Sequence, residues 1–185
     1  MEFQTHSFKH DETVVNEDKF SKKYNELLEI ITSISDEDII VAFNNSHRKA
    51  KSISWVINKL LKEQLIKVGW SSESAIFQDK KYSDNRWRLD FAGFDISLEV
   101  AFNHGEAIAW NLLKPVLASE LNHVEKAIQT QIGIIICASR EMKDAGGFDG
   151  AIGEFEKFLT YLAPLQNVLT VPILIIGLKK PKTFK

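Results

Sequence analysis

Two segments in the first half of the chain carry apolar residues at helical spacing. One helical face between residues 20 and 34 consists of Phe20, Tyr24, Leu27, Leu28 and Ile31. Ser35, followed by three acidic residues, predicts the end of this helix and the N-cap of a new element. The apolar run 39–43 is too short to distinguish a helix from a strand. A further amphipathic helix is predicted from about 52 to 68, with an apolar stripe at Ile53, Val56, Ile57, Leu60, Leu61 and Leu65.

Alternating and continuous apolar runs predict the strands. Residues 87–103 are typical of a β-hairpin, and its second half places Ile96, Leu98, Val100 and Phe102 on one face and Ser97, Glu99, Ala101 and Asn103 on the other. The runs 132–137 and 170–177 are apolar on both faces, which is typical of central strands covered by helices on both sides. Helices are predicted over 106–129, with a bend at Pro115, and over 152–162. This order predicts an α/β fold with a central mixed β-sheet flanked by helices.

Length and composition narrow the class of protein. With 185 residues, of which 44% are hydrophobic and 26% charged, the chain is long enough for a single domain, 1–185, in which the polar segment 1–17 is an arm or a strand that needs a partner. It lacks a run of about 18 apolar residues and the apolar core of a signal peptide, so we expect a soluble, cytoplasmic protein without a membrane partner. The net charge of −2 argues against non-specific coating of nucleic acid but permits a DNA enzyme with positive charge concentrated in a cleft.

The predicted hairpin carries a pair of acidic residues. Asp90 and Glu99 are nine positions apart, and an antiparallel return of the chain brings them within a few ångströms of each other. Two carboxylates aimed at one point suit a hard cation such as Mg²⁺. The alternative is that both residues form the solvated side of an edge strand, and their spacing alone does not decide between the two.

The segment from Asp90 through Glu99 to Asn103 resembles the metal-binding core of the BglII/BstYI family of restriction endonucleases, a branch of the PD-(D/E)xK nuclease superfamily. Residues 52–61, ending at Gly69-Trp70, resemble the helix that leads into that core. Residues 132–136 and 171–178 resemble the two later buried strands of the family. Because the similarity covers roughly residues 24–180, it implies the restriction-endonuclease-like core fold for most of the chain.

The resemblance also implies a function. It predicts a Mg²⁺-dependent type II restriction endonuclease, part of a restriction-modification system, in which Asp90 and Glu99 bind the metal. The expected substrate is double-stranded DNA, cut at a short palindromic site related to a GATC core. The expected assembly is a homodimer, because a two-fold enzyme matches a two-fold site. The residues themselves do not set the recognition sequence or the cut position.

One position departs from the family pattern. The family carries Gln, Glu or Lys two residues after the metal-binding Glu, where it positions the attacking water, whereas this chain has Ala101. Either a neighbour takes over this role, for which His104, Glu106 and Lys114 are the candidates, or the chain is a catalytically weak or inactive sequence-specific DNA-binding protein on the same fold.

Several polar residues are candidates for DNA contacts. The basic residues Arg48, Lys49 and Lys51 precede a predicted helix N-terminus, an arrangement that favours phosphate, although a charged loop is often only solvated. Asn103 fits a phosphate contact. In the resembled family the loop after the first buried strand reads bases, which implies base contacts for Ser139, Arg140, Lys143 and Asp149. The glycines between 145 and 153 lack the GxGxxG spacing and a following Gly-Lys-Ser/Thr, which argues against a nucleotide-binding loop.

Overall fold

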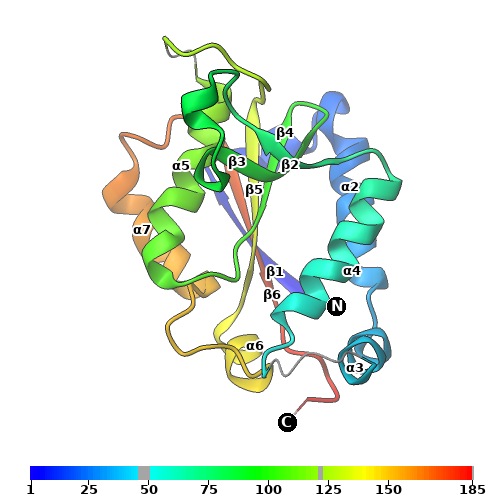
Figure 1. Cartoon of the computed structure of the whole chain (residues 1–185). Coiled ribbons are helices and arrows are strands. Elements are labelled where there is room, and N and C mark those ends of the chain that lie inside the picture. The colour runs from blue at the N-terminus through cyan, green and yellow to red at the C-terminus, as the bar shows by residue number, and fades with distance from the viewer. Residues whose placement is uncertain (46–50, 121–122, 185) are drawn as a thin grey trace.

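The computed structural model describes residues 1–45, 51–120 and 123–184. At its centre is a six-stranded sheet in the order β1-β6-β5-β4-β3-β2. The central strands β4, β5 and β6 run parallel, and the remaining neighbours pair antiparallel. The strands are β1 (Phe3–Phe8), β2 (Ser71–Ala75), β3 (Arg88–Gly93), β4 (Ile96–Val100), β5 (Ile132–Ala138) and β6 (Ile173–Leu178). The predicted α/β architecture with a central mixed sheet is therefore confirmed (Figure 1).

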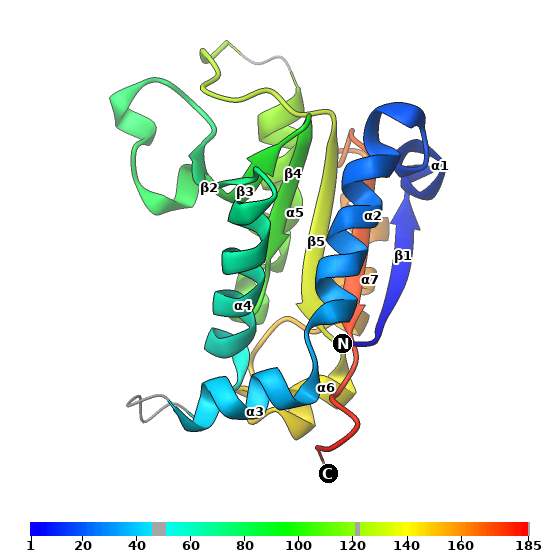
Figure 2. The same ribbon diagram turned by 90° about the vertical axis from the view of Figure 1, so that its right-hand side faces the viewer.

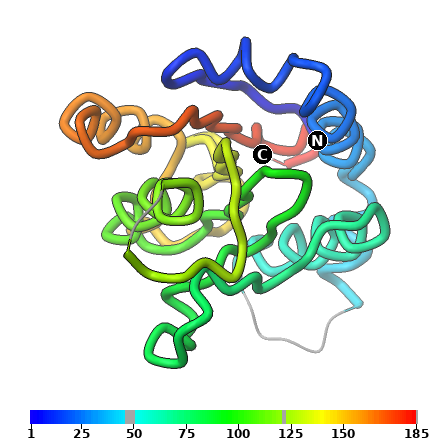
Figure 3. The backbone as a smooth tube through the Cα atoms, turned by 90° about the horizontal axis from the view of Figure 1, so that it is seen from above, coloured from blue at the N-terminus to red at the C-terminus, as the bar shows by residue number. Residues whose placement is uncertain are grey.

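Helices cover both faces of this sheet. They are α1 (Asp11–Val15), α2 (Asp18–Ser33), α3 (Asp36–Asn44), α4 (Ser54–Lys67), α5 (Ile108–Ser119), α6 (Arg140–Ala145) and α7 (Phe155–Leu165), together with the 3₁₀ turns η1 (Lys80–Tyr82), η2 (Asn85–Trp87) and η3 (Gly105–Ala107). Viewed along the sheet, α2 and α4 lie on one side and α5 and α7 on the other (Figures 1 and 3). None of the helices in the described part of the chain has the length and apolar composition needed to cross a membrane.

The polar N-terminal segment contributes an edge strand. β1 pairs antiparallel with β6, from Phe3 opposite Leu178 to Phe8 opposite Ile173. The segment is therefore a strand whose partner lies in the same chain, with α1 and α2 following directly (Figure 2).

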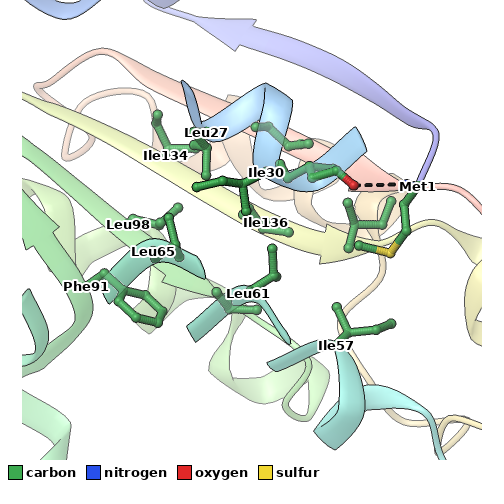
Figure 4. Packing of buried hydrophobic residues seen from close by; sticks show 14 of the residues in the cluster. Met1, Leu27, Ile30, Ile57, Leu61, Leu65, Phe91, Leu98, Ile134 and Ile136 are labelled. Carbon is green, nitrogen blue, oxygen red and sulfur yellow. Dashed lines mark hydrogen bonds between the residues drawn. The ribbon is translucent and has the colours of Figure 1, made fainter. Parts of the chain in front are cut away.

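The sheet is apolar on both faces because each face packs against a pair of helices. On one side, Leu27 of α2 and Leu61 and Leu65 of α4 pack with Ile134 and Ile136 of β5, all fully buried (Figure 4). The opposite face packs against α5 and α7 and is formed by Leu112, Ile135, Phe158 and Ile175. The continuous apolar runs of β5 and β6 follow from this two-sided burial.

A capping box at Ser35 marks the start of α3. The hydroxyl of Ser35 accepts a hydrogen bond from the Asp38 N–H at 3.1 Å, and the Asp38 carboxylate accepts one from the Ser35 N–H at 2.9 Å. This reciprocal capping box confirms the predicted N-cap at Ser35. It also shows that the ambiguous run 39–43 is helical, as part of α3.

The predicted helix over 106–129 is wrong beyond Ser119, where α5 ends. Downstream, the N–H of Gln78 donates to the Glu125 carbonyl at 3.0 Å and the N–H of Ala127 donates to the Ile76 carbonyl at 2.9 Å. Val124 and Ile128 pack with Ile76 in a small apolar cluster. The apolar spacing that suggested a longer helix thus belongs to a loop, and the backbone of this loop forms hydrogen bonds with residues 76–78.

Gly133 of β5 lets α5 approach the sheet closely. A Cβ atom added at Gly133 would lie 2.6 Å from Cβ and 2.8 Å from Cγ of Pro115 on α5. Both distances are well below van der Waals contact, so the helix can lie at this depth only over a residue without a side chain.

We predict that Gly133→Ala lowers the free energy of unfolding by about 1–3 kcal/mol, because the new methyl group overpacks a buried interface. Chemical denaturation measures the effect. The matched control is Gly150→Ala, since a Cβ there meets nothing within 4 Å. Equal stability of the two variants would contradict the close approach of α5.

Candidate active site

The two acidic residues of the hairpin lie opposite each other across adjacent strands. β3 and β4 pair with Phe91 opposite Leu98, so Asp90 and Glu99 form the next pair in the same register. The N–H of Asp90 donates to Oε1 of Glu99 at 3.2 Å, and the N–H of Val100 donates to Oδ2 of Asp90 at 2.8 Å. Each carboxylate is thereby held by the backbone of the other strand, and the two converge at one point of the sheet.

Lys114 reaches the same point from helix α5. Its Nζ donates to Oε2 of Glu99 at 2.6 Å, and the Lys114 and Glu99 side chains are only 9% and 1% exposed. Ala101, two residues beyond Glu99, is buried and contributes only a methyl group. Among the three candidates for the missing third role, Lys114 is the one that contacts the acidic pair.

The other two candidates lie elsewhere. His104 and Glu106 are exposed and belong to the turn that includes η3, and neither lines the cleft that Asp90 faces. Asp90, Glu99 and Lys114 are therefore brought together by the fold, and His104 and Glu106 are not.

Burial of two carboxylates beside one lysine makes the site electrostatically unusual. Burial raises the pKa of Glu99 to about 8, the charge of Asp90 adds to this rise, and Lys114 opposes it. Burial also raises the pKa of Asp90, against the hydrogen bond from Val100 and the positive charge of Lys114. Both carboxyl groups therefore retain their protons to a higher pH than they would in water.

This donor set fits a hard divalent cation. Both side chains offer carboxylate oxygens, the ligands that Mg²⁺ prefers, and a bound cation would stabilise the ionised form of both carboxylates, which burial disfavours. In the ranges 1–45, 51–120 and 123–184, no group of three or more His, Cys, Asp or Glu residues is arranged to hold a metal. A site of two carboxylates suits Mg²⁺, which usually keeps several waters and takes one or two protein carboxylates.

Asp90 faces a cleft of about 820 Å³ between helix α4 and the strands β2, β3 and β4. The sheet side is lined by Glu73, Asp90, Phe91, Val100, Phe102 and Asn103, and the α4 side by Ser54, Asn58, Lys59, Lys62, Glu63 and Ile66. Glu99 and Lys114 do not line this cleft; they lie behind Asp90, under α5. The acidic pair thus lies between the open cleft and the buried lysine, with Asp90 on the cleft side and Glu99 on the lysine side.

Asn103 lines the cleft, and a polar residue of α5 holds its side chain. The Nδ2 of Asn111, which is 2% exposed, donates to Oδ1 of Asn103 at 2.9 Å. Asn111 is one helical turn before Lys114, so α5 presents both polar side chains to the residues of β4 and its extension.

Glu73 is a site residue that the sequence pattern did not reveal. It has a φ of 53° within β2, and its neighbours Ser72 and Ser74 pair with Phe91 and Leu89, which places it beside Asp90. Residues 69–85 carry only a loose apolar pattern, and the alignment of Glu73 with Asp90 depends on the β2–β3 register. No local signal distinguishes it from other surface acids.

The predicted DNA-contacting residues near α6 are engaged within the chain. Nζ of Lys143 lies 2.5 Å and a guanidinium nitrogen of Arg140 lies 3.5 Å from the carboxylate of Glu154, which is 6% exposed. The Ser139 hydroxyl caps α6 by accepting a hydrogen bond from the Met142 N–H. Lys51 and Asp149 line a neighbouring pocket of about 500 Å³, and Arg48 and Lys49 lie outside the described residues.

Comparison with known proteins identifies one family and similar solved structures. A family model described as restriction endonuclease BglII/BglIII matches residues 3–178. The crystal structure of restriction endonuclease BglII complexed with a DNA 16-mer is similar with a TM-score of 0.71 and 20% identity, over 97% of this chain and 79% of that chain. The crystal structure of free BglII is similar with a TM-score of 0.57 and 16% identity, over 97% of this chain and 80% of that chain. No curated protein sequence matches the chain.

The family match extends over nearly the whole chain, and the two solved structures share its fold. The mixed sheet and its flanking helices are those of the BglII fold. The chain therefore belongs to the restriction endonuclease BglII/BglIII family and is a type II site-specific endonuclease.

Proposed function

We propose that this chain is a Mg²⁺-dependent restriction endonuclease that hydrolyses phosphodiester bonds of double-stranded DNA at a short palindromic site. The observation that carries this proposal is the convergence of Asp90, Glu99 and Lys114 beside an open cleft. Family membership supports the reaction class, and the donor set supports the choice of cation.

In this proposal Asp90 and Glu99 hold the cation through their carboxylate oxygens. A bound divalent cation polarises the phosphate and lowers the pKa of a nearby water. Asp90, which faces the cleft, lies where the scissile phosphate arrives. Glu99 connects the carboxylate pair to Lys114.

Lys114 takes the role that Ala101 cannot fill. Because Lys114 does not line the cleft, it acts on the attacking water through Glu99, whose carboxylate its Nζ holds in position at 2.6 Å. Because α5 is anchored on the sheet, this ammonium is fixed in position before substrate binds. A lysine on the neighbouring helix thus substitutes for a side chain on the strand.

We further propose that two copies of the chain act together on the DNA. Each chain carries one such carboxylate pair, so cutting both strands of a palindrome takes two chains related by two-fold symmetry. One solved structure of similar fold is that of BglII complexed with a DNA 16-mer, which supports duplex DNA as the substrate. A recognition site related to GATC, and DNA contacts from Asn103, the basic residues 48–51 and the α6 loop, remain predictions.

The first prediction is that plasmid DNA incubated with the protein and Mg²⁺ gives discrete fragments. Asp90→Asn, which keeps the shape and an acceptor for the Val100 N–H, should reduce the cleavage rate by about 10³-fold or more, because a ligand charge is lost. The matched control is Glu106→Gln, an exposed acid outside the site, which should cut normally. Retardation of DNA in a gel by the wild-type protein without any cutting would instead support a non-cleaving DNA-binding protein.

A second prediction concerns Lys114. Lys114→Met should reduce the cleavage rate by about 10–100-fold while DNA binding persists, because Glu99 loses the ammonium that holds its carboxylate in position for the cation. It should also lower the free energy of unfolding at pH 9 by about 3 kcal/mol, since breaking a buried pair leaves a buried charge. At pH 6 the loss should be smaller, because Glu99, whose pKa is raised, takes up a proton and becomes neutral.

Chemical denaturation at the two pH values measures this difference. The control is Lys182→Met, which breaks an exposed ion pair with Glu2 and should change stability by less than about 1 kcal/mol at either pH. Full cleavage activity in Lys114→Met would exclude the proposed role of this lysine.

A third prediction follows from the raised pKa of Glu99. A metal ligand must be deprotonated, and without metal Glu99 loses its proton only near pH 8. The Mg²⁺ concentration that gives half-maximal cleavage should therefore rise about tenfold for each unit that the pH falls below 8, for one displaced proton. Above pH 8 this concentration should level off. Equal values at pH 6.5 and 7.5 would show that Glu99 is not a ligand.

A further inference from the structure

Helix α4 presents a line of hydrogen-bond donors to the cleft. Ser54, Asn58 and Lys62 all line it, and they are spaced four residues apart, which places them in one row along the helix. Glu73 and Asp90 line the opposite side, on the sheet. We call Ser54, Asn58 and Lys62 the donor row of α4.

The two lysines of α4 that line the cleft differ in their ion pairing. Lys59, which also lines the cleft, forms an i,i+4 ion pair with Glu63 at 3.8 Å, so these two side chains compensate each other. Lys62 is exposed and has no ion pair within the described residues. The α4 side of the cleft therefore has one lysine without a direct ion-pair partner, and the charge of this lysine acts across the cleft on Asp90.

The donor row is held rigidly. The other side of α4 packs into the core through Val56, Ile57, Leu61 and Leu65, each fully buried. From Ser54 to Lys62 the row spans about 12 Å, given a helical rise of about 1.5 Å per residue. A DNA strand carries one phosphate for every 3.4 Å or so of helix axis, so the row is long enough to follow several consecutive phosphates.

We propose that the donor row of α4 binds the sugar–phosphate backbone of the DNA strand in the cleft and holds it against Asp90. The inference rests on the proposed nuclease function and names the substrate-binding side of the same site. Hydroxyl, amide and ammonium groups are the donors that proteins commonly use for phosphate oxygens, and such contacts position DNA without reading its sequence. In this arrangement the sheet side of the cleft binds the cation, and the α4 side binds the sugar–phosphate backbone of the DNA.

The test is DNA binding without catalysis. A short fluorescein-labelled duplex is titrated with the full chain in EDTA, by fluorescence anisotropy, over a series of monovalent salt concentrations. Lys62→Gln should weaken binding and reduce the slope of log K against log salt by about 0.9, the contribution of one neutralised phosphate. The matched control is Lys67→Gln, which removes the same charge from the same helix at an exposed position outside the cleft and should leave the slope unchanged.

A second variant tests Asn58, an uncharged member of the donor row. Asn58→Leu removes the amide donors and should raise KM for plasmid cleavage about three- to tenfold with little change in kcat, because the contact is made equally before and during reaction. Identical salt slopes for Lys62→Gln and Lys67→Gln, or an unchanged KM in Asn58→Leu, would overturn the inference. These outcomes differ from failure of the nuclease proposal, in which Asp90→Asn still cuts DNA or the wild-type protein binds DNA without cutting it.

Discussion

The pairing register between β3 and β4 is the constraint on which the site depends. It places Asp90 opposite Glu99, and a slip of one strand by one residue would turn that strand's carboxylate to the other face and separate the two acids. The connecting turn places Phe94 and Asp95 at φ values of 56° and 62°, a conformation that L-residues rarely adopt. Contacts with α2 and with the residue before β2 hold this turn: Lys19 of α2 pairs with Asp95 at 2.5 Å, and the ring of Phe94 packs edge-on against Trp70. The register of the acidic pair is therefore secured at the far end of the hairpin.

Helix α5 connects the packing of the fold to the chemistry of the site. Pro115 packs against Gly133 of β5, and the adjacent Lys114 reaches Glu99. Because the helix lies so close to the sheet, the ammonium stays buried and forms a short ion pair. This arrangement concentrates charge locally in a protein whose net charge is only −2. On the cleft side, Glu73 and Asp90 of the sheet face Lys59 and Lys62 of α4, so charges of opposite sign line the two sides of the cleft.

Much of the architecture was predictable because it depends on local patterns. The two-sided apolar runs predicted β5 and β6, the helical stripe between 52 and 68 predicted α4, and the Ser35 N-cap predicted the break between α2 and α3. The nine-residue spacing of Asp90 and Glu99 is also local, since a tight hairpin leaves few other registers. The convergence of these two acids, and the place of Lys114 among three candidates for the third role, were therefore predictable from the amino-acid sequence alone.

What the sequence did not determine are the contacts between elements that lie far apart in the chain. The end of α5 at Ser119 depends on backbone bonds between residues 76–78 and 125–127, and the position of Glu73 depends on the β2–β3 register. The choice of Lys114 over His104 and Glu106, and the pairing of Lys143 with Glu154, depend on which side chains meet in space. The sequence by itself therefore determined the elements and the acidic pair, through periodicity and short-range spacing. The tertiary structure alone decided the cleft, its donor row and which lysine contacts the acidic pair, because these arise from long-range packing that no local pattern encodes.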